Sequence, residues 1–290
     1  MRISQRAQRV EPFYVMELAK AAADMAAGAR PGDRPMITLN IGEPDFTAPP
    51  LVQLAAERAI HDGRSQYTAA TGLPALRRVI SGWYAARFGL DIDPGRIVIT
   101  AGASAALQLA CLALIEAGDE VLMPDPSYPC NRQFVQAAEG KAVLLPSGPA
   151  ERFQLSAEQV QAAVQRNADA QLSPLLRDVQ ECVRSLCFMF NALLDLSRNS
   201  VFDAVTRSFP DGTRIVRPAG GYFVWVELPI GVDAMALHQA ALAQQISLAP
   251  GPIFSATRGF GHCARLNYGH PWDAASEAAM AVLGRLLAAF

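Results

Sequence analysis

The chain has 290 residues, of which 51% are hydrophobic and 18% are charged, and its formal net charge at pH 7 is −2. This length and apolar content are enough for one large domain or two smaller ones with a substantial core. The small net charge argues against a nucleic-acid-binding surface and against an acidic tail. Arginine supplies nearly all of the positive charge, because the only lysines are Lys20 and Lys141.

The cysteines and histidines are not arranged for a metal site or for a disulfide framework. The 5 cysteines include no C-x-x-C pair, and the 4 histidines share no metal-ligand spacing. The N-terminal segment is polar, and the longest apolar run, residues 103–115, is interrupted by Gln108 and is too short to span a bilayer. We therefore expect a reduced, cytoplasmic protein with no metal and no membrane or nucleic-acid partner.

The first part of the chain predicts helices separated by polar and proline-rich breaks. A helix is expected over residues 12–28, followed by a Pro/Gly-rich break and a short strand that leads into the loop around residues 40–50. A second helix is expected over 50–61. A third begins near Pro74, since proline is well suited to the first turn of a helix.

From residue 96 the pattern becomes an alternation of strands and helices. Short buried strands are expected at 96–100, 120–123 and 142–145. Between the first two, a helix should run from about Ser104 to Glu116, with Gly118 as the glycine that stops it. Strands that alternate with helices indicate a parallel sheet covered on both faces, and therefore an α/β fold.

The second half of the chain has a different pattern. Ser156 and Gln159 form a capping box that predicts a helix, a longer helix is expected over 175–199, and no strand candidate appears between about 146 and 213. Beyond that gap, the expected elements are two strand-like runs around a Gly-Gly turn within 214–228, a helix over 233–245, strands at 246–250 and 263–269, and a closing helix over 273–290. This mixture predicts an α+β C-terminal lobe.

The stretch "TAGASAALQLA" (100–110) is typical of a phosphate-binding turn. Small residues at 101–106 let backbone N–H groups approach a ligand closely, and the helix that starts there directs its positive end to the same place. An ordinary strand-to-helix turn has the same composition, so other segments must decide between the two interpretations.

Five segments that follow one another along the chain together resemble a known family. They are "NIGEPDF" (40–46), "YTAATG" (67–72), "TAGASAAL" (100–107), "PDPSYPCNR" (124–132) and "ARLNYG" (264–269). Together they resemble the class I/II aminotransferases, pyridoxal-phosphate enzymes of fold type I. The C-terminal part is also similar to the aminotransferase-like domain of GntR-type transcription regulators. No N-terminal winged helix with a basic recognition helix accompanies it, so we expect no DNA binding.

The resemblance implies residues that bind the cofactor. Ala103, Ser104 and Ala105 would hold the phosphate of pyridoxal phosphate through backbone groups and the Ser104 hydroxyl. Tyr128 would stack on the pyridine ring. Tyr67 would reach the phosphate bound by the neighbouring subunit of a homodimer, the assembly usual in the family.

The resemblance also implies a site for the substrate, an amino acid or a 2-oxo acid. Gly42 would let the backbone meet the substrate carboxylate. Arg265 would hold that carboxylate in a bidentate pair, which the planar guanidinium suits. Without the resemblance, an arginine on this strand would be interpreted as a surface charge at a sheet edge.

The sequence departs from the family at the residue on which its chemistry depends. The family's lysine, in a Ser-Lys segment, forms a Schiff base with the cofactor and then moves the substrate α-proton. Neither Lys20 nor Lys141 lies in such a segment. An arginine cannot replace the lysine, because a guanidinium stays protonated. We therefore expect no catalytic residue and no covalent cofactor attachment.

Other family segments have no counterpart either, among them the Asn-Pro-x-x-Pro-x-Gly loop and the strand whose Asp pairs with the pyridine nitrogen. The gap falls between about residues 150 and 175, which predicts an internally deleted protein. The expected domains are 1–45 (N-terminal arm and a contribution to the small domain), 46–170 (truncated large cofactor-binding domain) and 171–290 (C-terminal small domain).

Three functional hypotheses remain open. The chain is an aminotransferase by descent whose deletion removed catalysis; or it is a non-catalytic protein that binds pyridoxal phosphate or another phosphate ligand, or docks to an intact relative; or it is an active enzyme that uses Lys20 or Lys141. The amino-acid specificity cannot be inferred from the sequence.

Overall fold

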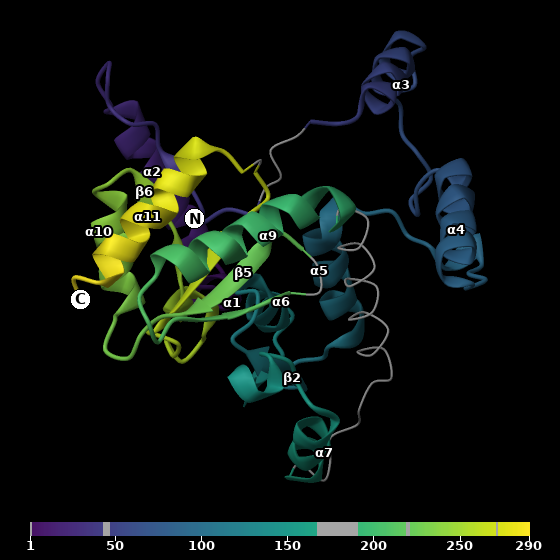
Figure 1. Ribbon diagram of the computed structural model, residues 1–290. Coiled ribbons are helices and arrows are strands. Elements are labelled where there is room, and N and C mark those ends of the chain that lie inside the picture. Colours follow the sequence, from purple (N-terminus) through teal and green to yellow (C-terminus); the bar gives the residue numbers. More distant parts are fainter. Residues whose placement is uncertain (1, 43–46, 167–190, 219–220, 271) are drawn as a thin grey trace. The chain divides into compact units, whose positions relative to one another are not determined.

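The computed structural model describes residues 2–42, 47–166, 191–218, 221–270 and 272–290 (Figure 1). The chain divides into two compact units, each described here by itself. Unit 1 comprises residues 1–45 and 115–290, and unit 2 comprises residues 46–114. The three-domain division expected from the sequence stays a prediction.

The elements of unit 1 are, in chain order, α1 (Gln5–Arg9), α2 (Tyr14–Ala27), β1 (Ile37–Thr38), β2 (Glu120–Asp125), α6 (Cys130–Ala137), β3 (Lys141–Pro146), η2 (Pro149–Glu151), α7 (Ala157–Arg166), α9 (Asn191–Ser208), β4 (Arg214–Val216), β5 (Phe223–Glu227), α10 (Ala234–Leu242), β6 (Ile246–Ser247), β7 (Ala249–Pro250), η3 (Gly251–Phe254), β8 (Cys263–Asn267) and α11 (Ala274–Leu287). The elements of unit 2 are α3 (Pro50–His61), α4 (Pro74–Phe88), η1 (Pro94–Arg96) and α5 (Gly102–Leu114).

An antiparallel sheet with the strand order β4-β5-β8-β7 organises unit 1. In its register Trp225 lies opposite Arg265, and Val224 lies opposite Leu266. Because side chains alternate along a strand, the valine and leucine face one side of the sheet while the tryptophan and arginine face the other. The first face is buried, with Val224, Val226 and Leu266 at most 2% exposed.

Helices α9 and α11 pack together over this buried face and lie side by side in Figure 1. Val201 and Val205 of α9, with Met280 and Leu283 of α11, join the sheet residues in one core. Gly284 marks the closest approach of the two helices, since a Cβ there would lie 1.9 Å from the backbone oxygen of Ser208.

Two small parallel pairings complete unit 1. β1 pairs with β6, and Leu39, just after β1, belongs to the same core. β2 pairs with β3 over six residues, from Glu120 opposite Lys141 to Asp125 opposite Pro146. These are the only parallel strand pairs in the described residues, so the parallel sheet that the sequence predicts is small.

Unit 2 has no apolar core of its own in the described residues. None of its helices α3, α4 and α5 has a buried residue. Apolar side chains such as Leu51 (81% exposed) and Val79 (68% exposed) are open to solvent. Burial of apolar surface is the main stabilising term in folding, so the described residues of unit 2, taken by themselves, contribute little of this stabilisation.

Most elements predicted from the sequence are confirmed. The helix at 50–61 is α3, Pro74 begins α4, and α5 covers the expected helix, shifted by two residues. Both hydrogen bonds of the capping box form, from Ser156 N to Gln159 Oε1 (2.9 Å) and from Gln159 N to Ser156 Oγ (3.2 Å).

The predicted strand at 96–100 is wrong. η1 ends at Arg96, residues 97–100 have no regular structure, and Val98 is 50% exposed. A strand needs a neighbour with which to pair, and no strand within the described ranges pairs with this segment. The helix predicted at 175–199 lies largely outside the described residues, and its described part begins α9.

Within the part of the chain that the structure describes, no helix has both the length and the apolar character needed to cross a bilayer. The same residues contain no cluster of three or more His, Cys, Asp or Glu side chains arranged for a metal ion.

We predict that unit 1 loses stability on mild acidification through His238. This side chain is 4% exposed with an unpartnered Nδ1, and burial lowers the pKa of His238, while a backbone hydrogen bond to Leu248 acts in the opposite direction. The unfolded chain takes up a proton near pH 6.5, whereas the fold favours the neutral ring. The contribution of the neutral His238 ring to the free energy of unfolding is therefore complete above about pH 6.5, and it is lost as the pH falls below that value.

Urea unfolding midpoints measured between about pH 5 and pH 7 check this expectation. His238→Leu should flatten the dependence, and His61→Gln is the matched control, since the His61 side chain is 91% exposed. An equally steep acid dependence in His238→Leu would contradict the assignment.

A second prediction concerns the α9–α11 contact. Gly284→Ala places a methyl group against the backbone of Ser208 and should destabilise unit 1 by about 1–3 kcal/mol, as overpacking does. Gly261→Ala is the control, because no atom lies within 4 Å of a Cβ at that position. Denaturant unfolding of both variants measures the difference, and equal stabilities would show that the helices separate easily.

Candidate functional site

The second face of the β4-β5-β8-β7 sheet, to which Trp225 and Arg265 point, holds the half-buried guanidinium group of Arg265. The Cζ atom of Arg265 lies 3.8 Å from the ring centroid of Phe223 and 4.5 Å from that of Phe254. Its Nη2 donates a hydrogen bond to the backbone oxygen of Asn40 at 2.8 Å, and its Nε is buried without a hydrogen-bond partner. The surface interpretation of this arginine is therefore excluded, because β8 is an inner strand of the sheet.

The charge of Arg265 is held in apolar surroundings. Burial lowers the pKa of Arg265 to about 10, and the phenol groups of Tyr222 and Tyr128 act in the opposite direction. The guanidinium thus stays charged at neutral pH, and no carboxylate among the described residues forms an ion pair with it. A desolvated cation without an anion is unfavourable, so the arrangement suits an incoming carboxylate group.

Gly42 lies against the same aromatic ring. A Cβ at Gly42 would come within 1.8 Å of Cζ of Phe223, so any larger residue would displace the ring on which Arg265 stacks. The structure therefore brings Gly42 and Arg265 together through Phe223. The rest of the motif, residues 43–46, lies outside the described residues.

The loop that contains Tyr128 is tied to the C-terminal lobe by a buried carboxylate. Asp125, at the end of β2, accepts hydrogen bonds from Ser255 Oγ (2.9 Å), Thr257 Oγ1 (3.2 Å) and the backbone N–H of Ala256 (3.2 Å). Next along the chain, Ser127 N donates to the backbone oxygen of Phe254 at 3.1 Å. Tyr128 follows directly and meets Phe13 edge-on, with ring centroids 5.7 Å apart.

These contacts identify positioning residues that the sequence did not indicate. Asp125, Ser255 and Thr257 connect the Tyr128 loop with Phe254, which packs on Arg265. Only Asp125 lay in a quoted motif, and nothing in the sequence showed that its partners are 130 and 132 residues away. Asn40 was likewise missed, although it opens the segment "NIGEPDF".

The other predicted residues belong to unit 2. Ala103, Ser104 and Ala105 form the first turn of α5, and Gly102 before them has a φ of +80°. This first turn is mostly open to solvent, so its N-terminal amides and the Ser104 hydroxyl are accessible to an anion.

The Tyr67 loop is held to the segment before that turn. Ile99 N donates to the backbone oxygen of Thr71 at 3.1 Å, and Gly72, with a φ of +95°, packs against the Ile99 side chain. Tyr67 itself is fully exposed. Unit 2 therefore contains the four predicted phosphate-binding residues, and unit 1 contains Gly42, Tyr128 and Arg265.

The residues present fit the phosphate of pyridoxal phosphate but not its covalent attachment. The α5 turn offers small residues, a glycine in the left-handed region and a helix N-terminus. The two lysines of the chain, Lys20 on α2 and Lys141 at the start of β3, are both exposed. A lysine that acts as a nucleophile usually needs a desolvated or cationic environment to lose its proton.

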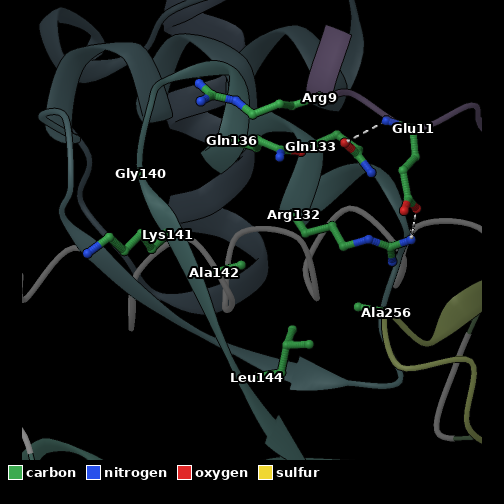
Figure 2. Close-up of a pocket in the computed structure, with 10 residues that line it drawn as sticks. All are labelled: Arg9, Glu11, Arg132, Gln133, Gln136, Gly140, Lys141, Ala142, Leu144 and Ala256. Carbon is green, nitrogen blue, oxygen red and sulfur yellow. Dashed lines mark hydrogen bonds and ion pairs between the residues drawn. The ribbon is translucent and has the colours of Figure 1, made fainter. Parts of the chain in front are cut away.

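A cavity of about 400 Å³ in unit 1 includes Lys141 in its lining (Figure 2). It lies between α1, α6 and β3, and Arg9, Glu11 and Arg132 also line it. Figure 2 shows Arg132 pointing toward Glu11, with which it forms an ion pair at 3.3 Å, and Lys141 pointing away from both. The cationic groups do not converge on one point, so this cavity is not suited to bind a phosphate group.

Comparison with protein families and curated proteins agrees with the geometry. Residues 34–177 match the family described as aminotransferase class I and II. The valine–pyruvate aminotransferase of Mycobacterium tuberculosis is 38% identical over 170 residues, which make up 59% of this chain and 40% of that protein. An aspartate aminotransferase of Rhizobium meliloti is 38% identical over 160 residues, 55% of this chain and 39% of that protein. The matches thus span about two fifths of the curated relatives' length.

Solved structures with the same fold cover the chain from end to end. An aminotransferase from Mycobacterium tuberculosis superposes with a TM-score of 0.82 at 24% identity, covering 100% of both chains. The aspartate aminotransferase of Thermus thermophilus, solved with maleate, gives a TM-score of 0.79 at 21% identity and covers 99% of this chain and 100% of that one. The fold is therefore that of the fold type I aminotransferases. Residues 34–177 are similar to the aminotransferase class I and II family, whose cofactor is pyridoxal phosphate.

Proposed function

We propose that this chain is an aminotransferase-family protein that does not itself transfer amino groups between an amino acid and a 2-oxo acid. The absence of a lysine in the family's position is the observation that carries this proposal. The full sequence has only Lys20 and Lys141, and both are exposed. Lys20 belongs to α2 and Lys141 begins β3, so neither lies in the sequence segment of the α5 turn or of Arg265.

We further propose that the missing chemistry reflects an internal deletion. The stretch shared with the Mycobacterium tuberculosis relative is 59% of this chain and 40% of that protein, so the relative is longer. The described parallel pairing in the region of the large domain is limited to β2 and β3. A deletion after about residue 150 accounts for both observations, and the GntR-type similarity of the C-terminal part is a separate expectation from the sequence.

The proposed remaining activity is ligand binding. The α5 turn would hold the phosphate of pyridoxal phosphate without a covalent bond, Tyr128 would stack on its ring, and Tyr67 would reach the site of a second copy in a cytoplasmic homodimer. Gly42 and Arg265 would bind the carboxylate of an amino acid or a 2-oxo acid.

The second candidate function is that of a non-catalytic regulatory protein that binds pyridoxal phosphate or another phosphate ligand, or docks to an intact relative. The helices of unit 2 support it, because none of α3, α4 and α5 has a buried residue and a docked relative would cover their apolar side chains. A decayed remnant would be insoluble or molten, whereas a binding protein would unfold cooperatively and bind its ligand reversibly.

The first test is to add pyridoxal phosphate to the purified protein and to record the absorbance before and after borohydride. We expect the spectrum of the free aldehyde and no cofactor-bearing lysine peptide, because neither lysine is placed or desolvated for the reaction. The control is Lys20→Arg/Lys141→Arg, a chain without lysine, which should bind the cofactor equally well. Cofactor trapped on either lysine, together with amino transfer that the double variant loses, would contradict the proposal.

A further prediction concerns the proposed phosphate-binding turn at the start of α5. Ser104→Asp places a carboxylate in the first turn of α5, where it repels a phosphate and occupies the helix N-terminus itself. We expect the dissociation constant for pyridoxal phosphate, followed by fluorescence titration, to rise by about tenfold. Ser65→Asp adds the same charge at an exposed position of the same unit and should leave the affinity unchanged. An equal loss of affinity for pyridoxal phosphate in both variants would mean that net charge, and not the α5 turn, determines binding.

A further inference from the structure

The chain before α2 lies on unit 1 with almost no apolar burial. Helix α1 has no buried residue, and residues 2–12 are all exposed. A segment with so few buried contacts opens locally at a low cost in free energy. The position of this N-terminal segment (residues 5–14) is therefore determined by a small number of specific contacts.

Glu11 makes two of these contacts with helix α6. Its carboxylate forms an ion pair with Arg132 at 3.3 Å, and its backbone N–H donates a hydrogen bond to Gln133 Oε1, also at 3.3 Å (Figure 2). The Arg132 side chain is only 15% exposed, whereas the Glu11 side chain is 52% exposed. Because the carboxylate is open to solvent, dissolved salt weakens its attraction to Arg132.

The charges around the cavity between α1, α6 and β3 make Glu11 important for holding the segment. Among the residues that line this cavity, Glu11 carries the only carboxylate, whereas Arg9, Arg132 and Lys141 are cationic. Repulsion of Arg9 by the cations of α6 and β3 opposes the docking of α1, and the carboxylate of Glu11 offsets it. Loss of this one negative charge would leave three like charges around the cavity.

The residues that follow Glu11 reach the Tyr128 loop and the segment after η3. Phe13 meets the Tyr128 ring edge-on, with the ring centroids 5.7 Å apart. The Cζ atom of Arg258 lies 4.3 Å from the ring centroid of Tyr14. Tyr128 is 42% exposed, so the edge of Phe13 is one of the contacts that fix the plane of its ring.

We propose that Glu11 is a positioning residue for the Tyr128 ring. Its ion pair with Arg132 holds the N-terminal segment on α6, and Phe13 of that segment keeps the Tyr128 ring in the plane in which it stacks on a pyridine ring. The proposal rests on the proposed function, in which Tyr128 stacks on the ring of pyridoxal phosphate. Glu11 lies in none of the five family segments, so the resemblance does not assign this role.

The first test is amide hydrogen exchange on the full chain without cofactor. The N–H of Ser127, which donates to the backbone oxygen of Phe254 at 3.1 Å, reports on the opening of the Tyr128 loop. We expect its protection to fall about threefold in Glu11→Gln, the size of effect usual for one partly exposed ion pair. Raising NaCl from about 0.05 M to about 0.5 M should lower the protection in the unaltered chain and not in the variant.

A control and a double-mutant cycle assign the effect to the ion pair. Glu17→Gln removes the same charge from an exposed position on α2 and should leave the protection of the Tyr128 loop unchanged. Arg132→Gln should lower it as Glu11→Gln does. The double variant Glu11→Gln/Arg132→Gln should lose no more protection than the single variants, because each of them already removes the same interaction.

The second test separates positioning of the ring from general stability. Pyridoxal phosphate is compared with glycerol phosphate, which has the phosphate group and no ring. We expect Glu11→Gln to raise the dissociation constant for pyridoxal phosphate about threefold and to leave that for glycerol phosphate unchanged. In a chain that already carries Tyr128→Leu, Glu11→Gln should change neither constant, since no tyrosine ring remains to be positioned.

Three results would overturn the inference. They are protection of the Tyr128 loop that does not respond to salt in the unaltered chain, equal effects of Glu11→Gln and Glu17→Gln, and equal weakening of both phosphate ligands by Glu11→Gln. If a variant does not fold, the salt series on the unaltered chain still decides. Lysine trapping, or no binding of pyridoxal phosphate, would refute the proposed function and would not alter the exchange results, so the two failures are distinguishable.

Discussion

The burial of one guanidinium group constrains the arrangement of the candidate site. Arg265 lies on an inner strand, opposite Trp225 on one side and Ala249 on the other. Because side chains alternate along β8, a slip of one residue would turn the charge into the apolar core and expose Leu266. The register of the sheet and the position of the charge are thus determined together. Aromatic faces and the backbone oxygen of Asn40 stabilise the cation, but they leave its charge uncompensated.

The candidate ligand-binding residues of unit 1 are linked to that cation through short connections. Phe254 stacks on the guanidinium and accepts a hydrogen bond from Ser127, directly before Tyr128. Asp125 fixes the start of the same loop by binding Ser255 and Thr257. A ligand group at Arg265 and a ring at Tyr128 are therefore positioned by one hydrogen-bonded connection between β2 and the segment after η3. In unit 2, the segment before the candidate phosphate-binding turn is held by the hydrogen bond from Ile99 to Thr71, but none of the helices α3, α4 and α5 has a buried residue.

Local signals in the sequence were sufficient for most helices and for the C-terminal strands. Pro74, the Ser156–Gln159 capping box and the alternation in β5 and β8 each act over a few residues, so they can be detected without tertiary information. The strand expected at 96–100 failed because strand formation depends on a neighbour that a local pattern cannot supply. Asn40, Ser255 and Thr257 were missed for the same reason, since their partners lie on distant segments. Family motifs predicted Gly42 and Arg265 as site residues, and only the structure showed that the ring of Phe223 contacts both of them.

Binding and chemistry depend on different parts of this fold. A phosphate can be held by the first turn of a helix, and a carboxylate by an arginine on a strand, and each of these arises within one segment of the chain. Amino transfer needs a particular amine at a particular point of the cofactor, and both lysines of this chain are exposed. On the function proposed above, loss of an internal segment would remove the reaction at once. Recognition of the ligand's charged groups would depend on α5 and β8 and would be retained as long as the sheet of unit 1 folds.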